Sequence, residues 1–221
     1  MSEISVIIRS RNEDRWIGHT IQSILDHIKK PQIIVVDNNS SDRTLENINR
    51  FKHDPNLKSD ISNNFTEINI YNIDDYTPGR ALNFGVSKAK NNYILIISSH
   101  CVLQKFNKKK HIDDLENYVA IFGNQIPIYE GKKIKKKYIW SHFQEKELVN
   151  MYSEMEGRYF FHNALALYEK KFLLENKFDE NLLGKEDRYW AKDVIQLGKS
   201  ILYDPTMSVD HHYTENGNTW K

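Results

Sequence analysis

Uninterrupted apolar runs alternate with segments of helical periodicity along the first half of the chain. The apolar runs predict strands at 4–10, 32–37, 65–73 and 93–97. Between them, apolar residues recur at helical spacing in 14–28, 45–51 and 77–90. This alternation predicts an α/β fold with a parallel sheet that helices cover on both faces. Right-handed crossovers then place the carboxyl ends of these strands at one edge of the sheet.

The pattern becomes less regular after residue 104. We expect a strand at 119–129, a helix at 144–159, a strand and then a helix within 161–176, a helix at 184–198, and short extended pieces at 200–205 and 207–213. Asp14 is the expected N-cap of the first helix, and Gly198 is expected to end the last one. No Gly/Ser-rich linker interrupts the sequence, so a single domain over 1–221 is expected.

Composition narrows the class of protein. The net charge of +1 is too low for a dedicated nucleic-acid binder, so no nucleic-acid partner is expected. A single cysteine excludes an intramolecular disulfide and suits a reducing compartment. The sequence shows no signal-peptide pattern and no apolar run near the ~20 residues that span a bilayer. We therefore expect a cytoplasmic protein, with the inner face of the membrane as a further location to consider.

Two of the predicted strands end in polar residues. Asp37 ends 32–37, and Ser98, Ser99 and His100 follow 93–97. Because the strand ends meet at one edge, these residues are expected to face one crevice, where open α/β sheets bind ligands. Asp37 is also suited to a purely local role in an Asx turn or as a helix cap.

Four stretches together carry a resemblance to a known family. They are ISVIIRSRNEDRWIGHTIQSIL, QIIVVDNNSSDRT, GRALNFGVSKAKNNYILIISSHCVL and FDENLLGKEDRYWAKDVIQLGKSILYDPTMSVDHH. In this order they resemble family 2 glycosyltransferases of the glycosyltransferase-A fold, in particular the rhamnosyltransferase-like enzymes of bacterial surface polysaccharides. The resemblance implies a mostly parallel central sheet with a Rossmann-like, nucleotide-binding N-terminal half. It assigns 1–104 to the donor half and 105–221 to the acceptor and catalytic half.

The resemblance implies an inverting glycosyltransferase that moves a sugar from a nucleotide-sugar donor to a hydroxyl of a glycan or lipid-linked glycan acceptor. A non-catalytic relative that binds nucleotide or glycan is one alternative. A sugar nucleotidyltransferase is another, although such enzymes favour a Gly-rich basic loop after the first strand, and RSRNED contains no glycine. The sequence indicates no oligomeric state.

Donor-binding residues are expected in three places. Arginine forks suit diphosphate and ribose, and free backbone N–H groups at a helix start attract phosphate. An exposed arginine on a capped helix is an equally good explanation for the arginine of TPGRALNFG. The residues that the family pattern assigns to the donor are Arg11, Glu13, Asp37, Arg80, Asn83, Ser98 and Ser99.

The metal site departs from the family pattern. Family members usually carry Asp-x-Asp where this chain has Ser98, Ser99 and His100. The resemblance implies His100 as a metal ligand, with His211 of VDHHY as a second, because alternating faces let only one of His211 and His212 enter the cleft. Imidazole suits Mn²⁺ better than Mg²⁺. In the alternative, these histidines bind the diphosphate directly or only pack.

The catalytic base is expected at the start of the last helix. The family's Glu-Asp signature falls on Glu186 and Asp187, with Asp187 as the base and Glu186 as its alternate or an acceptor-binding group. Acidic residues also favour a helix N-terminus for purely structural reasons. Asn163 and Trp190 are the expected acceptor contacts, and core packing explains Trp190 equally well.

A lysine run with aromatic residues at its end lies in GKKIKKKYIW, residues 131–140. A solvated loop is the simpler interpretation. The alternative is peripheral contact with an anionic membrane that carries a lipid-linked acceptor.

Overall fold

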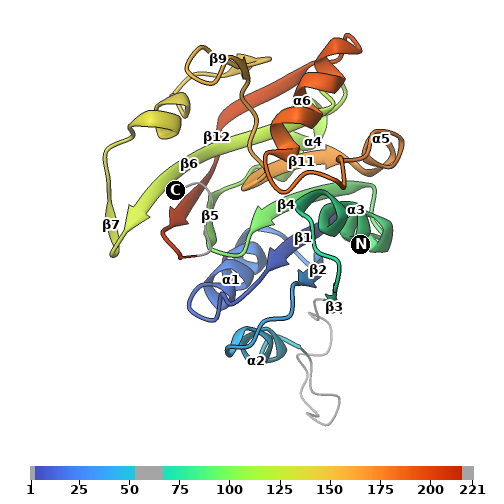
Figure 1. Ribbon diagram of the computed structural model, residues 1–221, viewed down its shortest axis with the longest axis vertical. Helices are drawn as coiled ribbons and strands as arrows, with labels where there is room; N and C mark the ends of the chain where they lie inside the picture. Colours follow the sequence, from blue (N-terminus) through green and yellow to red (C-terminus); the bar gives the residue numbers. More distant parts are fainter. Residues whose placement is uncertain (1–2, 53–66, 216–221) are drawn as a thin grey trace.

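The first half of the protein is a parallel sheet with helical crossovers. The computed structural model describes residues 3–52 and 67–215 (Figure 1). Its first elements are β1 (Ile4–Ser10), α1 (Ile17–His27), β2 (Gln32–Asp37), α2 (Thr44–Asn49), β3 (Glu67–Asn72), α3 (Pro78–Lys88) and β4 (Tyr93–Ser98). Strands β3, β2, β1 and β4 lie side by side in that order and pair in parallel. The predicted parallel sheet is therefore confirmed, although 65–66 lie outside the described residues.

The second half extends the same sheet with mixed pairing. It consists of β5 (Cys101–Lys105), α4 (Lys108–Asp114), β6 (Ala120–Tyr129), β7 (Lys132–Lys133), a 3₁₀ helix (Tyr138–His142), β8 (Leu148–Val149), β9 (Tyr152–Ser153), β10 (Arg158–Tyr159), β11 (Leu165–Glu169), α5 (Lys170–Glu175), α6 (Glu186–Gln196) and β12 (Ile201–His212). Beyond β4 the order is β11, β6, β12, β5. Strand β11 runs antiparallel to both its neighbours, which joins the two halves into one sheet (Figure 1).

Helices cover both faces of the sheet, as the sequence pattern predicts. Successive residues of β1 point to opposite sides, so Val6 and Ile8 pack with α1 and α2, while Ile7 packs with α3. Helices α5 and α6 join α3 on its face (Figure 1). Because both faces are covered, ligand access is left to the strand ends.

Two expectations about local structure are wrong. The helix expected at 144–159 is replaced by β8 and the β9–β10 hairpin, since Asn150 (φ 51°) and Gly157 (φ 62°) take left-handed conformations that interrupt a helix. The first helix begins after Trp16, not after Asp14, because the Glu13 carbonyl accepts the N–H groups of Trp16 and Ile17 in a preceding turn.

The two extended pieces expected at the end of the chain form one strand with a bulge. The pairing of β12 with β6 shifts between Asp204 and Ser208. Buried Asp204 stabilises the bulge by accepting hydrogen bonds from Thr206 N at 2.7 Å and Lys110 Nζ at 2.6 Å. Before the shift Tyr203 packs on the α3 face, and after it Val209 packs on the α1 face. The bulge therefore reverses which face the odd-numbered residues of β12 occupy.

Candidate active site

A cleft of about 780 Å³ opens at the carboxyl edge of the sheet. Its walls come from the ends of β1 and β4, the segment before β11, the β9–β10 hairpin and the start of α6. Residues from both halves of the chain therefore meet in one place. Eight of the predicted site residues line this cleft: Arg11, Glu13, Ser98, Ser99, His100, Asn163, Glu186 and Asp187.

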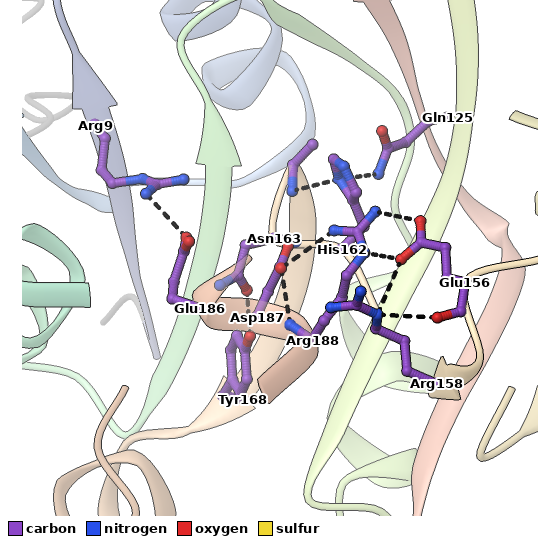
Figure 2. Close-up of polar contacts among 11 residues, drawn as sticks. Arg9, Gln125, Glu156, Arg158, His162, Asn163, Tyr168, Glu186, Asp187 and Arg188 are labelled. Atoms are coloured by element: carbon purple, nitrogen blue, oxygen red, sulfur yellow. Dashed lines mark hydrogen bonds and ion pairs between the residues drawn. The ribbon is translucent and has the colours of Figure 1, made fainter. Parts of the chain in front are cut away.

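The acid pair at the start of α6 is held by residues from three elements, as Figure 2 shows. Arg9 Nη1, at the end of β1, donates to Glu186 Oε1 at 3.0 Å. Asp187 Oδ2 accepts the backbone N–H of Asn163 at 3.1 Å. Asp187 Oδ1 accepts the backbone N–H of Arg188 at 2.8 Å and its Nη1 at 3.3 Å. These bonds fix both carboxylates in the cleft wall.

The two acids have different electrostatic environments. Burial raises the pKa of Glu186, and the charge of Arg9 offsets this only in part. Burial also acts to raise the pKa of Asp187, but the Arg188 charge and the N–H donors outweigh it and bring the pKa below its usual value. Asp187 is therefore ionised at neutral pH and able to accept a proton.

A second ion-pair layer supports the acid pair. Arg188 Nε donates to Glu156 Oε2 at 2.9 Å, and Arg158 lies 3.6 Å from the same oxygen (Figure 2).

Asn163 Oδ1 accepts a hydrogen bond from Tyr168, while Asn163 Nδ2 is buried with no hydrogen-bond partner in the described residues. Asn163 lines the cleft, but its Nδ2 is covered in this structure.

His100 lines the cleft and contacts a second histidine, His211, which is buried and is not among the lining residues. His100 Nδ1 lies 3.0 Å from Glu13 Oε1, and His100 Nε2 lies 3.1 Å from His211 Nε2. His211 Nδ1 lies 2.8 Å from Gln125 Oε1. Burial holds the pKa of His211 well below its usual value, so this ring is neutral. His212 instead stacks on Trp16, with ring centroids 3.7 Å apart.

This arrangement fits a divalent cation. Two Nε2 atoms 3.1 Å apart need a proton or a cation between them, and each ring has an oxygen acceptor at its Nδ1, as metal-binding histidines usually do. Within 3–52 and 67–215, no group of three or more His, Cys, Asp or Glu residues is arranged to hold a metal ion. The histidine pair thus fits a cation whose remaining ligands are diphosphate oxygens and water.

Other predicted site residues do not line the cleft. Asp37 is fully buried, and its carboxylate accepts hydrogen bonds from Ser40 N at 2.8 Å and Ser40 Oγ at 2.6 Å. These bonds correspond to the local Asx-turn role that the sequence offered as an alternative to donor binding. The expectation that Trp190 contacts the acceptor is wrong. Trp190 lies in the core against Phe161, and its Nε1 donates to Asn176 O at 2.7 Å. It has no face left for a sugar ring.

Pro78, the first residue of α3, lines the cleft, but the predicted residues Arg80 and Asn83 do not. Arg80 is paired with Asp75 at 3.4 Å and Glu180 at 3.5 Å. Asn83 Nδ2 donates to Phe178 O at 2.9 Å. Both side chains fasten α3 to the segment before α6, and the structure does not bring them to the other predicted donor residues.

Comparison with known proteins identifies the family of this chain. The family model of Glycosyl transferase family 2 matches residues 5–177. The chain belongs to this family. A search of curated proteins returns no match.

Solved structures show that this family 2 glycosyltransferase has the glycosyltransferase-A fold. S. aureus TarS 1–349 in complex with UDP-GlcNAc matches with a TM-score of 0.71 and 18% identity, over 99% of this chain and 61% of that chain. GalNAc-T7 with UDP, GalNAc and Mn²⁺ matches with a TM-score of 0.69 and 15% identity, over 98% of this chain and 45% of that chain. The chain thus spans about three fifths of TarS 1–349.

Proposed function

We propose that this chain is an inverting glycosyltransferase that uses a nucleotide-sugar donor and a hydroxyl acceptor. The observation that carries the proposal is that Asp187, an ionised buried carboxylate, lines the same cleft as His100 at the end of β4. An inverting transfer needs a base on one side of the sugar and charge stabilisation for the leaving diphosphate on the other. Family membership, through a match over residues 5–177 that includes His100, supports a glycosyltransferase.

The residues divide between donor and acceptor. We assign the donor to Arg11, Glu13, Ser98 and Ser99, and a divalent cation to His100 and His211. When bound, the cation balances the negative charge of the diphosphate. Asp37, Arg80 and Asn83 remain predicted donor residues that need a rearrangement to reach the cleft. This proposal keeps 1–104 as the donor half and 105–221 as the acceptor and catalytic half.

The transfer step follows from this placement. The acceptor oxygen forms a bond to the anomeric carbon while the bond from that carbon to the diphosphate oxygen breaks. Asp187 takes the hydroxyl proton, and the nucleoside diphosphate leaves with the electron pair. Arg9 holds Glu186 beside this position, where Glu186 contacts the acceptor, as does Asn163.

A nucleotide-sugar panel tests the proposed function. UDP, GDP, dTDP and CMP sugars, including a deoxyhexose donor for the rhamnosyltransferase resemblance, are incubated with and without Mn²⁺. Release of the nucleoside diphosphate, or of CMP from the CMP sugars, is measured. We expect one donor class to give metal-stimulated release that Asp187→Asn removes while donor binding persists. Binding without turnover, even with the acceptor present, favours a non-catalytic relative. Pyrophosphate from a nucleoside triphosphate and a sugar phosphate favours a nucleotidyltransferase.

The lysine run supports a lipid-linked acceptor at an anionic membrane. Lys132, Lys133, Lys135 and Lys137 are exposed, and Tyr138, which is 67% exposed, lines the cleft. Exposed basic side chains in a run that ends with an aromatic residue at the cleft suit a phospholipid surface. No helix in 3–52 or 67–215 has the length and apolarity to cross a bilayer. We therefore propose peripheral contact with the inner face of the membrane.

Reversing these four charges is expected to weaken binding to vesicles that contain anionic phospholipid. At about 1 kcal/mol per basic residue, the loss of partition is 10²-fold or more. Lys136 is left unchanged because its Nζ donates to Asn124 Oδ1 and Phe143 O. Vesicle sedimentation measures the effect. The matched control reverses four exposed lysines elsewhere: Lys171, Lys177, Lys192 and Lys199. If both variants lose vesicle binding to the same extent, the lysine run has no specific role in membrane binding.

A further inference from the structure

Gln125 lies between two histidine rings in the middle of β6. Its side chain is fully buried. Gln125 Oε1 is 2.8 Å from His211 Nδ1, and Gln125 Nε2 is 3.0 Å from His162 Nδ1. Figure 2 shows the amide directed at the His162 ring. One amide therefore contacts a predicted metal ligand and a second histidine that lines the cleft.

The His162 ring fixes the orientation of this amide. His162 Nδ1 lies within reach of two N–H donors, the Gln125 side chain at 3.0 Å and the backbone of Ala164 at 3.4 Å. A ring nitrogen that accepts these bonds carries no hydrogen. Burial lowers the pKa of His162 to about 4, so the ring is neutral and its hydrogen is on Nε2. The NH₂ group of Gln125 must therefore face His162.

The same orientation sets the state of His211. With its NH₂ group toward His162, Gln125 presents its carbonyl oxygen to His211. This oxygen only accepts, so His211 carries its hydrogen on Nδ1. A neutral ring protonated at Nδ1 has its lone pair on Nε2. That atom is the one 3.1 Å from His100 Nε2.

We infer that Gln125 is a positioning residue that holds His211 and His162 in opposite tautomers and so directs the His211 Nε2 lone pair toward His100. The inference rests on the proposed function for its metal-binding consequence. A metal needs a neutral imidazole whose second nitrogen donates to an acceptor, and loss of such an acceptor costs typically 10–100-fold in metal affinity.

Two substitutions separate these effects. Gln125→Leu removes the acceptor for His211 and the donor for His162, which releases both rings. Gln125→Glu keeps an acceptor for His211 but offers His162 an oxygen in place of an N–H group. The glutamate variant is expected to retain the His211 tautomer and to place hydrogen on Nδ1 of His162. Gln32→Leu is the matched control, since Gln32 is also buried and hydrogen-bonded in the sheet, at the opposite end of β2 from the cleft.

The test uses the full chain labelled with ¹⁵N-histidine. Long-range ¹H–¹⁵N spectra of the metal-free protein report each tautomer, and electron paramagnetic resonance of free Mn²⁺ reports affinity. We expect Nδ1–H at His211 and Nε2–H at His162 in the wild type. In Gln125→Leu we expect a mixed His211 tautomer and a Kd for Mn²⁺ raised about 10–100-fold. Gln32→Leu is expected to change neither.

Three results would overturn the inference: a folded Gln125→Leu variant with the wild-type tautomer and Mn²⁺ affinity, a wild type with hydrogen on His211 Nε2, or a wild type with no Mn²⁺ binding. The tautomer spectra require no substrate or turnover. Failure of the donor panel together with the expected spectra would therefore count against the proposed transferase activity alone.

Discussion

Replacing Asp187 by asparagine is expected to lower kcat for sugar transfer by about 10²–10⁴-fold, the usual contribution of a general base. Asparagine keeps the shape of the side chain and the carbonyl acceptor, but it cannot take the acceptor proton. Donor affinity is expected to change little, because Asp187 faces the acceptor in the proposed arrangement. Transfer kinetics with the donor identified by the panel, together with calorimetry of nucleotide binding, measure the two effects.

Glu186→Gln is the matched control, and the pH profile distinguishes the two acids. A base works only when deprotonated, so kcat/KM falls as the pH drops through its pKa. The pKa of Asp187 is lowered, which puts this fall below the ordinary aspartate value of about 3.9. The pKa of Glu186 is raised, so a fall above about 4.3 would indicate Glu186. Full activity in Asp187→Asn with loss in Glu186→Gln would reverse our assignment.

Replacing His211 by alanine is expected to remove stimulation by Mn²⁺ and to lower kcat/KM by about 10²-fold or more. A Lewis-acid cation supplies several kcal/mol toward the developing diphosphate charge, and each 1.36 kcal/mol is about tenfold in rate. Titrating the rate with Mn²⁺ measures the loss. The control is His212→Ala, which removes the neighbouring ring from its stack on Trp16 and leaves the pair intact.

The outcome with chelator decides between the metal and its alternative. If the wild type keeps full activity in EDTA while His211→Ala remains impaired, the histidines act on the diphosphate directly. Equal activity of His211→Ala and wild type at every Mn²⁺ concentration would exclude His211 from the reaction.

The sequence pattern predicts the parallel half of the fold well. Strands such as β2, from Gln32 to Asp37, are buried along their full length, so a continuous apolar run identifies them without tertiary information. The region 144–159 is different. Its structure depends on left-handed residues such as Asn150 and on pairing with β12, and neither leaves a periodic signal. The bulge in β12 likewise depends on contacts from α4.

The candidate site likewise contains residues that the sequence predicts and residues that it does not. His100 is found because topology places the end of its strand at the cleft edge, and Asp187 is found from the Glu-Asp signature of the family resemblance. Gln125 and Arg188 are missed, since their roles arise from partners distant in the sequence. One signal was present, because a glutamine inside the apolar stretch AIFGNQIPIY is unusual for a buried strand.

The number of residues in the bulge of β12 decides whether His211 or His212 faces His100. Side chains of a strand alternate, so deleting one residue between Asp204 and Ser208 would present His212 to His100 and turn His211 outward. A two-residue change would keep His211 on the same face but move it two places along the sheet, away from His100. Relatives whose bulge is one residue shorter are thus expected to carry their histidine one place along. In this protein a one-residue insertion, which would present Asp210 in place of His211, should be as harmful as loss of the imidazole itself.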